Sequence, residues 1–502
     1  MKKTALLILL VALFSVFCFG CADTDLDDGV QTTTTAPPQN LQEPSENFEY
    51  KTDSDTVTIK KYIGNNETVI IPDTIESKPV TVIGETAFQG NATVKTVKLP
   101  NTVRAVKWGA FSDCKNLENV ILNEGLTELG HSVFAGESKI EEIVIPSTVT
   151  DIDEFTFGYC QSLKSVRFLG NAPDGYLNRE IPHAPTGVDY KIHYESGASG
   201  FSSPFWNGYP TFEYGASEEI PTYEGFQYVE NSNGIAIMRY VGSETEIIIP
   251  EKIKNKNVTE IGALAFSANG NIESVEIPST VTLIGARSFY ACSALSSVSL
   301  SDGVEKIDMS AFLGCSNLSD VSLPSSLTYI GDFAFSNCTA LKSITVPSGV
   351  SHLGAQAFAY SGLESLTLTD GLEAIGEAAF ASTEITEIIL PDSIRTVGYS
   401  AFSGCRKLQS VTLSEGLVTV KNLAFGSTAI AEIIIPETAQ EITELAFDHC
   451  RLLQAVKFEG NAPSDYIDES NRSHNTEYTV YYREGALGFT SPRWNGYKTQ
   501  IW

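Results

Sequence analysis

Cysteine is the residue type in this chain best suited to chemistry, and its spacing is regular. Seven of the nine cysteines lie three residues after a phenylalanine that recurs every 22 or 23 residues within each of two stretches. These seven are Cys114, Cys160, Cys292, Cys315, Cys338, Cys405 and Cys450. Most other copies carry Asn, Ser or Thr there, so the position favours a small side chain able to hydrogen-bond turn backbone. Because no Cys-x-x-Cys pair occurs among these seven cysteines, we predict buried structural thiols and no zinc or redox site.

Histidine is the second candidate for chemistry. The six histidines are His131, His183, His193, His352, His449 and His474. None has a partner at metal-ligand spacing, and no His-Glu-x-x-His or nucleophile-elbow motif occurs. His449 stands beside Cys450, but the repeat already accounts for that cysteine, and no carboxylates stand out as a glycosidase pair. We therefore predict that the chain is not an enzyme and requires no cofactor or metal.

The N-terminus has the pattern of an exported protein. Two lysines precede a long apolar run, so residues 1–20 are predicted to be a signal peptide. Gly20 and Cys21 resemble the end of a bacterial lipobox, although Cys18 stands where Leu is usual. We predict that Cys21 is lipidated and anchors the protein to the bacterial membrane at the cell surface, with plain secretion as the alternative. Residues 21–46, which are acidic and rich in Thr, Pro and Gln, are predicted to form a disordered tether.

The charge of the chain restricts its partners. With 33 basic and 62 acidic residues, the formal net charge is −29. This charge argues against nucleic acid as a partner and against electrostatic adsorption to anionic lipid. Membrane contact is therefore expected only through the N-terminal lipid anchor. We interpret the acidity as a source of solubility for a large exposed surface.

Self-similarity is the strongest signal in the sequence. Residues 322–350 show its frame, LxxVxLPxxLxxIGxxAFxxC. A phenylalanine marks each of thirteen copies: Phe88, Phe111, Phe134, Phe157, Phe266, Phe289, Phe312, Phe335, Phe358, Phe380, Phe402, Phe425 and Phe447. Apolar residues that alternate with polar ones, such as Ile344 and Val346, predict a short strand with one buried face. Pro347 then ends this strand, because proline cannot donate a ladder hydrogen bond.

A second extended stretch follows in each copy and leads to a glycine in eight of them, including Gly331 and Gly354. We predict that this glycine forms a sharp turn with unusual backbone angles, and that a brief helical turn then places the phenylalanine inside. One coil cannot bury its own apolar face, so the coils must stack into a solenoid. Stacked coils lie about 4.8 Å apart, so distance alone does not exclude a disulfide from Cys315 to Cys292 or Cys338, although reduced thiols are expected.

The frame resembles the BspA-like class of leucine-rich repeat proteins. The shared features are the LxxVxLP strand and the IGxxAFxxC segment after it, over about residues 57–168 and 235–458. The resemblance implies a curved repeat solenoid with parallel sheets and with variable residues on its exposed faces. It also implies a role in adhesion to host proteins or to other cells.

The repeats predict two tandem capped arrays. The first four marker phenylalanines and the four that follow them align at a constant offset of 178 residues, which indicates duplication of a whole unit. We predict a first array at 47–214 with four coils, a linker at 215–222, and a second array at 223–502 with nine coils.

Each array ends in a Trp-Asn-Gly-Tyr cluster. The last coil of a solenoid exposes apolar core, and aromatic side chains bury much area per residue when they cover it. Trp206, Tyr209, Trp494 and Tyr497 are therefore predicted to be structural cap residues. Sugar binding by these clusters is the alternative.

The outward strand positions of the second array carry small hydroxyl side chains. They are Ser297, Ser299, Ser322, Ser343, Thr345, Ser365, Thr367, Ser410 and Thr412. We consider them a candidate binding face for an extended partner; the alternative is a solvated face with good strand propensity and no ligand. The face has no aromatic stripe, which counts against sugar stacking.

Together these features predict a non-catalytic recognition or adhesion protein of the cell surface. Its partner would be an extracellular protein or another cell-surface ligand, with the chain itself a monomer. Two other functions remain open: a carbohydrate-binding or carbohydrate-active surface protein, and an envelope scaffold or spacer.

Overall fold

The computed structural model describes residues 42–153, 155–158, 160–173, 190–443, 445–463 and 478–502. Cys21, the signal peptide and most of the tether lie outside these residues, as do His183 and His474. Within the described residues, no helix has the length and apolar character needed to cross a membrane.

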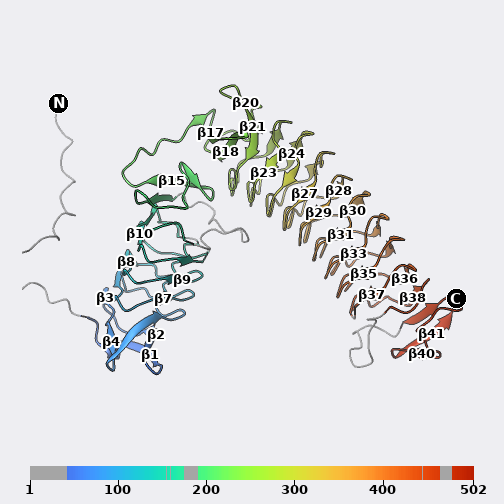
Figure 1. Ribbon diagram of the computed structural model, residues 1–502, viewed down its shortest axis with the longest axis horizontal. Helices are drawn as coiled ribbons and strands as arrows, with labels where there is room; N and C mark the ends of the chain where they lie inside the picture. The colour runs from blue at the N-terminus through green and yellow to red at the C-terminus, as the bar shows by residue number, and fades with distance from the viewer. Residues whose placement is uncertain (1–41, 154, 159, 174–189, 444, 464–477) are drawn as a thin grey trace, which may run out of the picture. The chain divides into compact units, whose positions relative to one another are not determined.

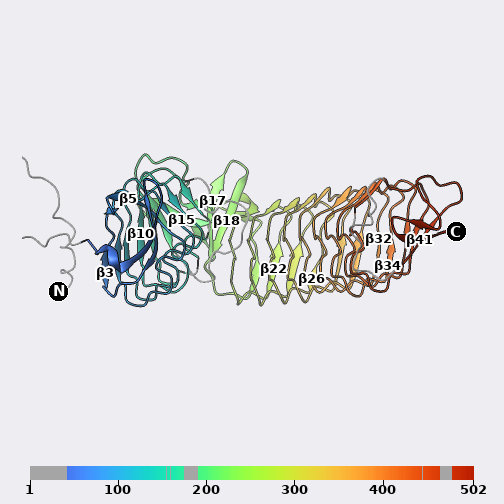
Figure 2. The same ribbon diagram turned by 90° about the horizontal axis from the view of Figure 1, so that it is seen from below.

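Each coil contributes one longer strand to a common face, called here the long-strand face. Its members are β3 (Thr68–Ile70), β6 (Thr96–Lys98), β8 (Asn119–Ile121), β10 (Glu142–Ile145), β12 (Ser165–Phe168), β19 (Glu246–Ile248), β22 (Ser274–Ile277), β24 (Ser297–Leu300), β26 (Asp320–Val321), β28 (Ser343–Val346), β30 (Ser365–Leu368), β32 (Glu387–Ile389), β34 (Ser410–Thr412), β36 (Glu432–Ile435) and β38 (Ala455–Phe458). In β28 the burial alternates between exposed and buried, as the period of two predicts. Figure 2 shows strands of this face as a row of arrows.

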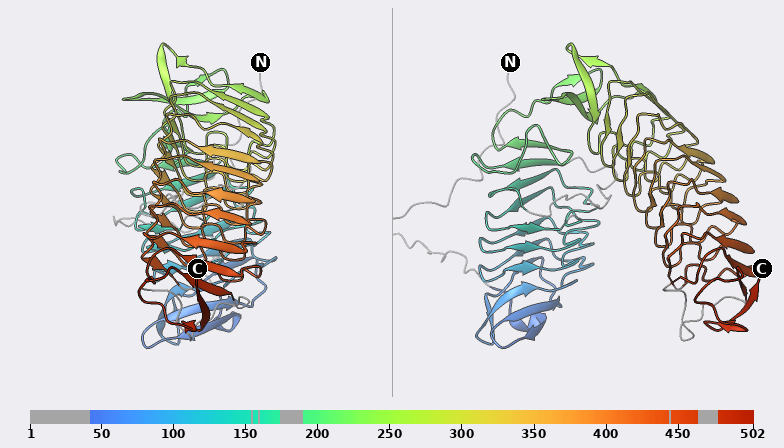
Figure 3. Two further views of the ribbon diagram at one scale, coloured as in Figure 1. Left: turned by 90° about the vertical axis from the view of Figure 1, so that its right-hand side faces the viewer. Right: turned by 45° about the vertical axis from the view of Figure 1, so that its right-hand side comes forward.

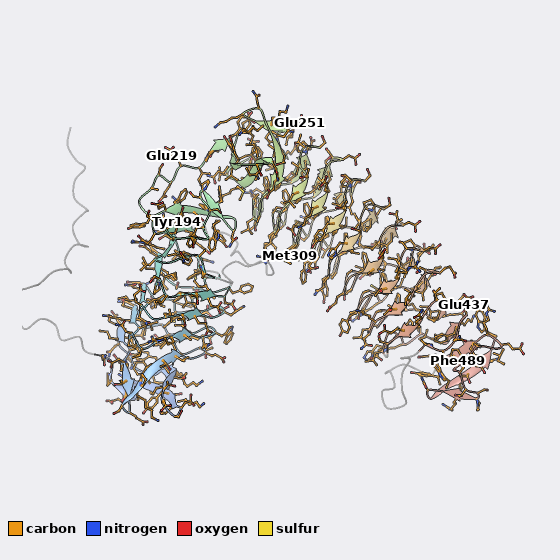
Figure 4. All side chains as sticks on the ribbon, viewed as in Figure 1. Tyr194, Glu219, Glu251, Met309, Glu437 and Phe489 are labelled. Carbon is orange, nitrogen blue, oxygen red and sulfur yellow. The ribbon has the colours of Figure 1, made fainter. Side chains whose placement is uncertain are left out.

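A second strand, mostly of two residues, follows in each coil on another side. These strands are β5 (Lys78–Ile83), β7 (Ala105–Val106), β9 (Glu128–Leu129), β11 (Asp151–Ile152), β21 (Lys256–Ile261), β23 (Leu283–Ile284), β25 (Lys306–Ile307), β27 (Tyr329–Ile330), β29 (His352–Leu353), β31 (Ala374–Ile375), β33 (Thr396–Val397), β35 (Thr419–Val420) and β37 (Glu441–Ile442). Figure 4 labels Met309, just after β25, and Glu437, just after β36, on opposite borders of the coil stack.

Strands of successive coils pair in parallel and in register. Ser343 lies opposite Ser365, and Tyr329 lies opposite His352. The ladders on the long-strand face are interrupted between β8 and β10, β26 and β28, β30 and β32, and β34 and β36, because these neighbours belong to different sheets. The structure is therefore a solenoid of stacked coils with short parallel strands, as predicted (Figures 1 and 3).

Hairpin strands precede the coils and short strands follow them. The preceding elements are the 3-10 helix η1 (Ser45–Asn47), β1 (Phe48–Thr52), β2 (Val57–Tyr62), β4 (Thr74–Ile75), β16 (Thr222–Tyr223), β17 (Phe226–Asn231), β18 (Gly234–Tyr240) and β20 (Lys252–Ile253). The following elements are β13 (Lys191–Tyr194), β14 (Phe205–Trp206), β15 (Tyr209–Glu213), β39 (Thr479–Tyr482), β40 (Arg493–Trp494) and β41 (Tyr497–Ile501).

The marker phenylalanines form the centre of the core. All thirteen are buried, and those of neighbouring coils have ring centroids 4.8–5.9 Å apart. Phe312, for example, stacks at 5.1 Å on both Phe289 and Phe335. Such aromatic stacking adds to the hydrophobic free energy of burial, so each ring links its coil to both neighbours.

The repeat glycines have a different role from the one predicted. The eight glycines after the second strand do not adopt the positive φ that unusual backbone angles would require. A Cβ on Gly331 would instead lie 2.5 Å from the backbone nitrogen of Met309, in the preceding coil. At Gly331 the neighbouring coil therefore approaches too closely for a side chain.

Positive φ occurs two residues later, at non-glycine positions such as Phe333 (φ 57°). The backbone N–H of Phe333 donates to the carbonyl oxygen of Ala355 in the next coil, which holds this conformation. Tight turns follow in place of the brief helical turn that we expected, because a left-handed residue interrupts any continuing helix.

The described buried side chains form two hydrophobic clusters. One runs from Phe48 to Tyr209 and the other from Phe226 to Tyr497. No sheet in the described chain combines strands from 48–213 with strands from 222–501. Residues Gln42–Trp502 nevertheless form one unit by their backbone contacts, so the division into two arrays remains a prediction.

Candidate binding face

The predicted hydroxyl residues lie in two columns on the long-strand face. Within the ladders, Ser297 is opposite Ser274, and Thr345 is opposite Thr367. Eight of the nine predicted residues are exposed, and the ninth, Ser297, is half-buried. The structure thus brings these side chains onto one surface, although it does not gather them into a single cluster.

Acidic and aliphatic residues interrupt the two columns. Glu276 and Asp320 occupy outward positions near the hydroxyls of β24. In β32 and in β36, a glutamate and, two positions later, an exposed isoleucine point outward. Ile389 is 70% exposed and Ile434 is 45% exposed. Sequence reasoning missed these residues because it selected small hydroxyl side chains and ignored the other members of the same columns.

Grooves open on the described part of this face. The first, of about 730 Å³, lies over β8 and β10 and has Ile121 and Val144 in its lining. The second, of about 440 Å³, lies over β34 and β36 and includes the predicted residues Ser410 and Thr412. The third, of about 330 Å³, lies over β22, β24 and β26 and includes Ser297, Ser299 and Ser322.

The cysteines are buried and bonded within the coils. Each of the seven donates from Sγ to the carbonyl oxygen of the marker phenylalanine in the preceding coil, at 2.9–3.3 Å. Burial raises the pKa of Cys114, Cys160, Cys292 and Cys338 to about 12. A thiol that stays protonated is a poor nucleophile, so this geometry fits a structural role.

The neighbouring pair His449 and Cys450 does not form a catalytic dyad. His449 Nε2 lies 3.4 Å from a carboxylate oxygen of Asp448, and the Cys450 thiol points to the carbonyl oxygen of Phe425 at 3.0 Å. His352 stacks on Tyr329 with ring centroids 4.5 Å apart. Among the described residues, no three His, Cys, Asp or Glu side chains converge as a metal site.

The aromatic clusters after the last coils lie largely inside. Trp494 is 7% exposed, with its ring centroid 4.8 Å from Phe489 and 6.0 Å from Phe458. Trp206 is partly buried and makes the equivalent contacts with Phe201 and Phe168. Tyr209 and Tyr497 are also buried, and such rings offer little surface for stacking on a sugar.

The coils match a known repeat family. The model of the BspA type leucine rich repeat region matches residues 57–173, 259–384 and 373–471, with six copies. The chain belongs to this family. No curated protein matches the sequence significantly.

Solved structures of other leucine-rich repeat proteins are similar to this chain. A leucine-rich cell-surface protein of Faecalibacterium prausnitzii is 24% identical, with 57% of this chain and 94% of that chain covered and a TM-score of 0.39. A leucine-rich repeat protein of Bacteroides ovatus is 21% identical, with 91% and 98% covered and a TM-score of 0.42. One of Eubacterium ventriosum is 20% identical, with 79% and 91% covered and a TM-score of 0.38. The family assignment rests on the repeat itself.

Proposed function

We propose that this BspA-type leucine-rich repeat protein is a non-catalytic recognition protein of the cell surface, which binds other proteins through its long-strand face. The observation that carries this proposal is the regular face itself, on which in-register strands present exposed side chains and three grooves. An extended polypeptide can contact many coils of such a surface through weak polar and apolar contacts.

A binding screen tests the recognition function. Residues 47–502 would be applied to an array of extracellular proteins, and saturable binding with a micromolar Kd is expected. A variant with Ser343→Lys and Thr345→Lys should weaken this binding at least tenfold, because two long, charged lysine side chains then cover the middle of the face. A matched variant with Thr396→Lys and Thr419→Lys, on the second-strand side, should bind normally. Absence of any saturable partner would contradict the proposal.

Attachment to the cell surface is the second part of the proposal. Its support is the apolar N-terminal run that ends in Gly20-Cys21, together with the description of the Faecalibacterium protein as a cell-surface protein. Lipid on Cys21 would hold the tether at the membrane. Replacing Cys21→Ala should move the protein from the membrane fraction to the medium; unchanged fractionation would contradict lipid anchoring.

A further inference from the structure

Two of the grooves occupy the same place in the repeat. The first groove lies over β8 and β10, and only β12 separates β10 from the β13–β15 segment. The second groove lies over β34 and β36, and only β38 separates β36 from the β39–β41 segment. All eleven residues that line the second groove stand at positions equivalent to lining residues of the first, at an offset of 290 or 291. Val144 corresponds to Ile434, and Pro146 corresponds to Pro436. The same surface feature has therefore formed twice within one chain.

Each groove coincides with an interruption of the parallel ladder. Strands β8 and β10 belong to different sheets, and so do β34 and β36. The next strands, β10 with β12 and β36 with β38, are paired again along four residues. The two walls of each groove are thus neighbouring strands that share no ladder pairing.

The linings combine apolar side chains with carboxylates. In the first groove, Ile121 is 43% exposed and Val144 is 39% exposed. In the second groove, Thr412 stands at the position of Ile121, and Ile434 stands at the position of Val144. Exposed aliphatic side chains side by side on a strand face are suited to contact with another apolar group.

Both grooves have a net charge of −3. Four glutamates and one lysine line the first, and three glutamates without a basic residue line the second. Across the described chain, no ion pair involves Glu118, Glu124 or Glu142 of the first groove, or Glu415 of the second. The other two glutamates of the second groove pair with Lys457 and Arg483. The first groove therefore has the larger uncompensated negative charge.

We propose that each groove binds an extended segment of a partner protein in which lysine or arginine residues alternate with apolar ones. This inference rests on the recognition function proposed above and names the chemistry of the partner. Alternate side chains of an extended chain point to the same side, so its apolar residues can lie on Val144 or Ile434. The stems of lysine and arginine cover apolar surface while their charged ends reach the glutamates.

A small cation alone does not fit this surface as well, because the aliphatic part of the lining would remain uncovered. The first groove binds more tightly, since it has Ile121 where the second has Thr412 and has more unpaired carboxylates. The chain thus presents two sites of one specificity and graded affinity.

Calorimetric titration of the full chain tests this proposal. The probe is a synthetic nonapeptide of alternating valine and lysine, compared with peptides of valine and glutamate and of serine and lysine. We expect two sites for the first peptide, a loss of at least fivefold in affinity when NaCl rises from about 50 to 500 mM, and no binding of the glutamate peptide. Equal affinity for the serine peptide would overturn the role of the apolar lining and leave a cation site only.

Paired substitutions identify the sites. Glu142→Gln with Val144→Thr should weaken the tighter site about tenfold, and Glu432→Gln with Ile434→Thr should weaken the other. The matched control is Glu387→Gln with Ile389→Thr, which changes the same outward pair on β32, outside both grooves, and should leave both affinities unchanged.

The outcomes separate this inference from the function on which it rests. A protein partner that binds the face and is unaffected by both groove variants would overturn the groove proposal and leave recognition intact. Peptide binding in the grooves without any protein partner on the array would support the grooves and overturn the wider function. All variants must keep the wild-type melting temperature.

Discussion

At the scale of single residues, the third position after each marker phenylalanine shows how different side chains donate a hydrogen bond to the same kind of acceptor. The thiol of Cys405 donates to the carbonyl oxygen of Phe380 in the coil before it, and the hydroxyl of Thr383 donates to that same oxygen from within its own coil. Cysteine therefore occurs here as a small buried donor, which explains why Ser and Thr replace it in other coils.

Burial of these thiols makes stability depend on pH. The pKa of Cys292 is raised from about 9 to about 12, so the folded protein keeps this proton at a pH where the unfolded chain loses it. The stability from this group is complete below pH 9 and is lost as pH rises toward 12. We expect the free energy of unfolding of the wild type, relative to Cys292→Ala, to fall by about 2 kcal/mol from pH 7.5 to 10.5.

Guanidinium unfolding of both proteins at the two pH values measures this difference. Titration of lysines and tyrosines affects both proteins alike and cancels. A difference that stays constant with pH would show that the thiol is accessible to water in the folded protein.

Close approach of the coils gives a second prediction at the residue scale. Gly331→Ala would place a methyl group 2.5 Å from the backbone nitrogen of Met309, and we expect a loss of about 1–3 kcal/mol in the free energy of unfolding. Gly270→Ala is the control, since its Cβ would meet only the Ser293 hydroxyl at 3.8 Å. Equal stability of the two variants would contradict the close-approach explanation.

At the scale of elements, the segment after the last coil covers the end of the hydrophobic core. β39 extends the parallel ladder beyond β38, and β41 extends it beyond β39. The short strand β40 pairs antiparallel with β41 at the end of this ladder. Trp494 packs beneath this turn against Phe458 and Phe489. The segment thus completes the ladder and covers the core at the same time.

Trp494→Ala should destabilise this end by about 3 kcal/mol, because a large buried ring is removed. Hydrogen exchange should accelerate in β38, β39 and β41 while β22 to β28 remain protected, since stability in a solenoid is carried by neighbouring coils. The control is Trp108→Ala, whose ring is 49% exposed and whose loss should cost less than about 0.5 kcal/mol. Loss of ligand binding with an unchanged melting temperature would contradict the cap role.

The strands of the coils could be predicted because the alternation of apolar and polar residues is short-range information. Ile344 and Val346 determine the buried side of β28 without reference to any other coil. The role of Gly331 could not be predicted, because it depends on the distance to a neighbouring coil. The grooves escaped prediction for the same reason: β8 and β10 have ordinary strand sequences, and the groove over them depends on how neighbouring coils pack.

At the scale of the whole chain, the duplication predicts two units able to fold separately. The two hydrophobic clusters lie within 48–209 and 226–497, and each includes its own marker phenylalanines and exit aromatics. We expect residues 47–214 and 223–502, expressed separately, each to give a cooperative melting transition by circular dichroism. Aggregation or absence of a transition in either fragment would show that the units need each other.

The position of the two grooves relative to the ends of the coils has a consequence for evolution. Each groove is lined by residues of the three consecutive long strands next to its exit segment, and successive marker phenylalanines within each stretch are 22 or 23 residues apart. Unequal recombination can therefore add or delete whole coils upstream without altering a groove. The first stretch has four marker phenylalanines and the second has nine, yet both keep the same eleven lining positions. The length of the solenoid, at about 4.8 Å per coil, can thus change during evolution while the lining of each groove is kept.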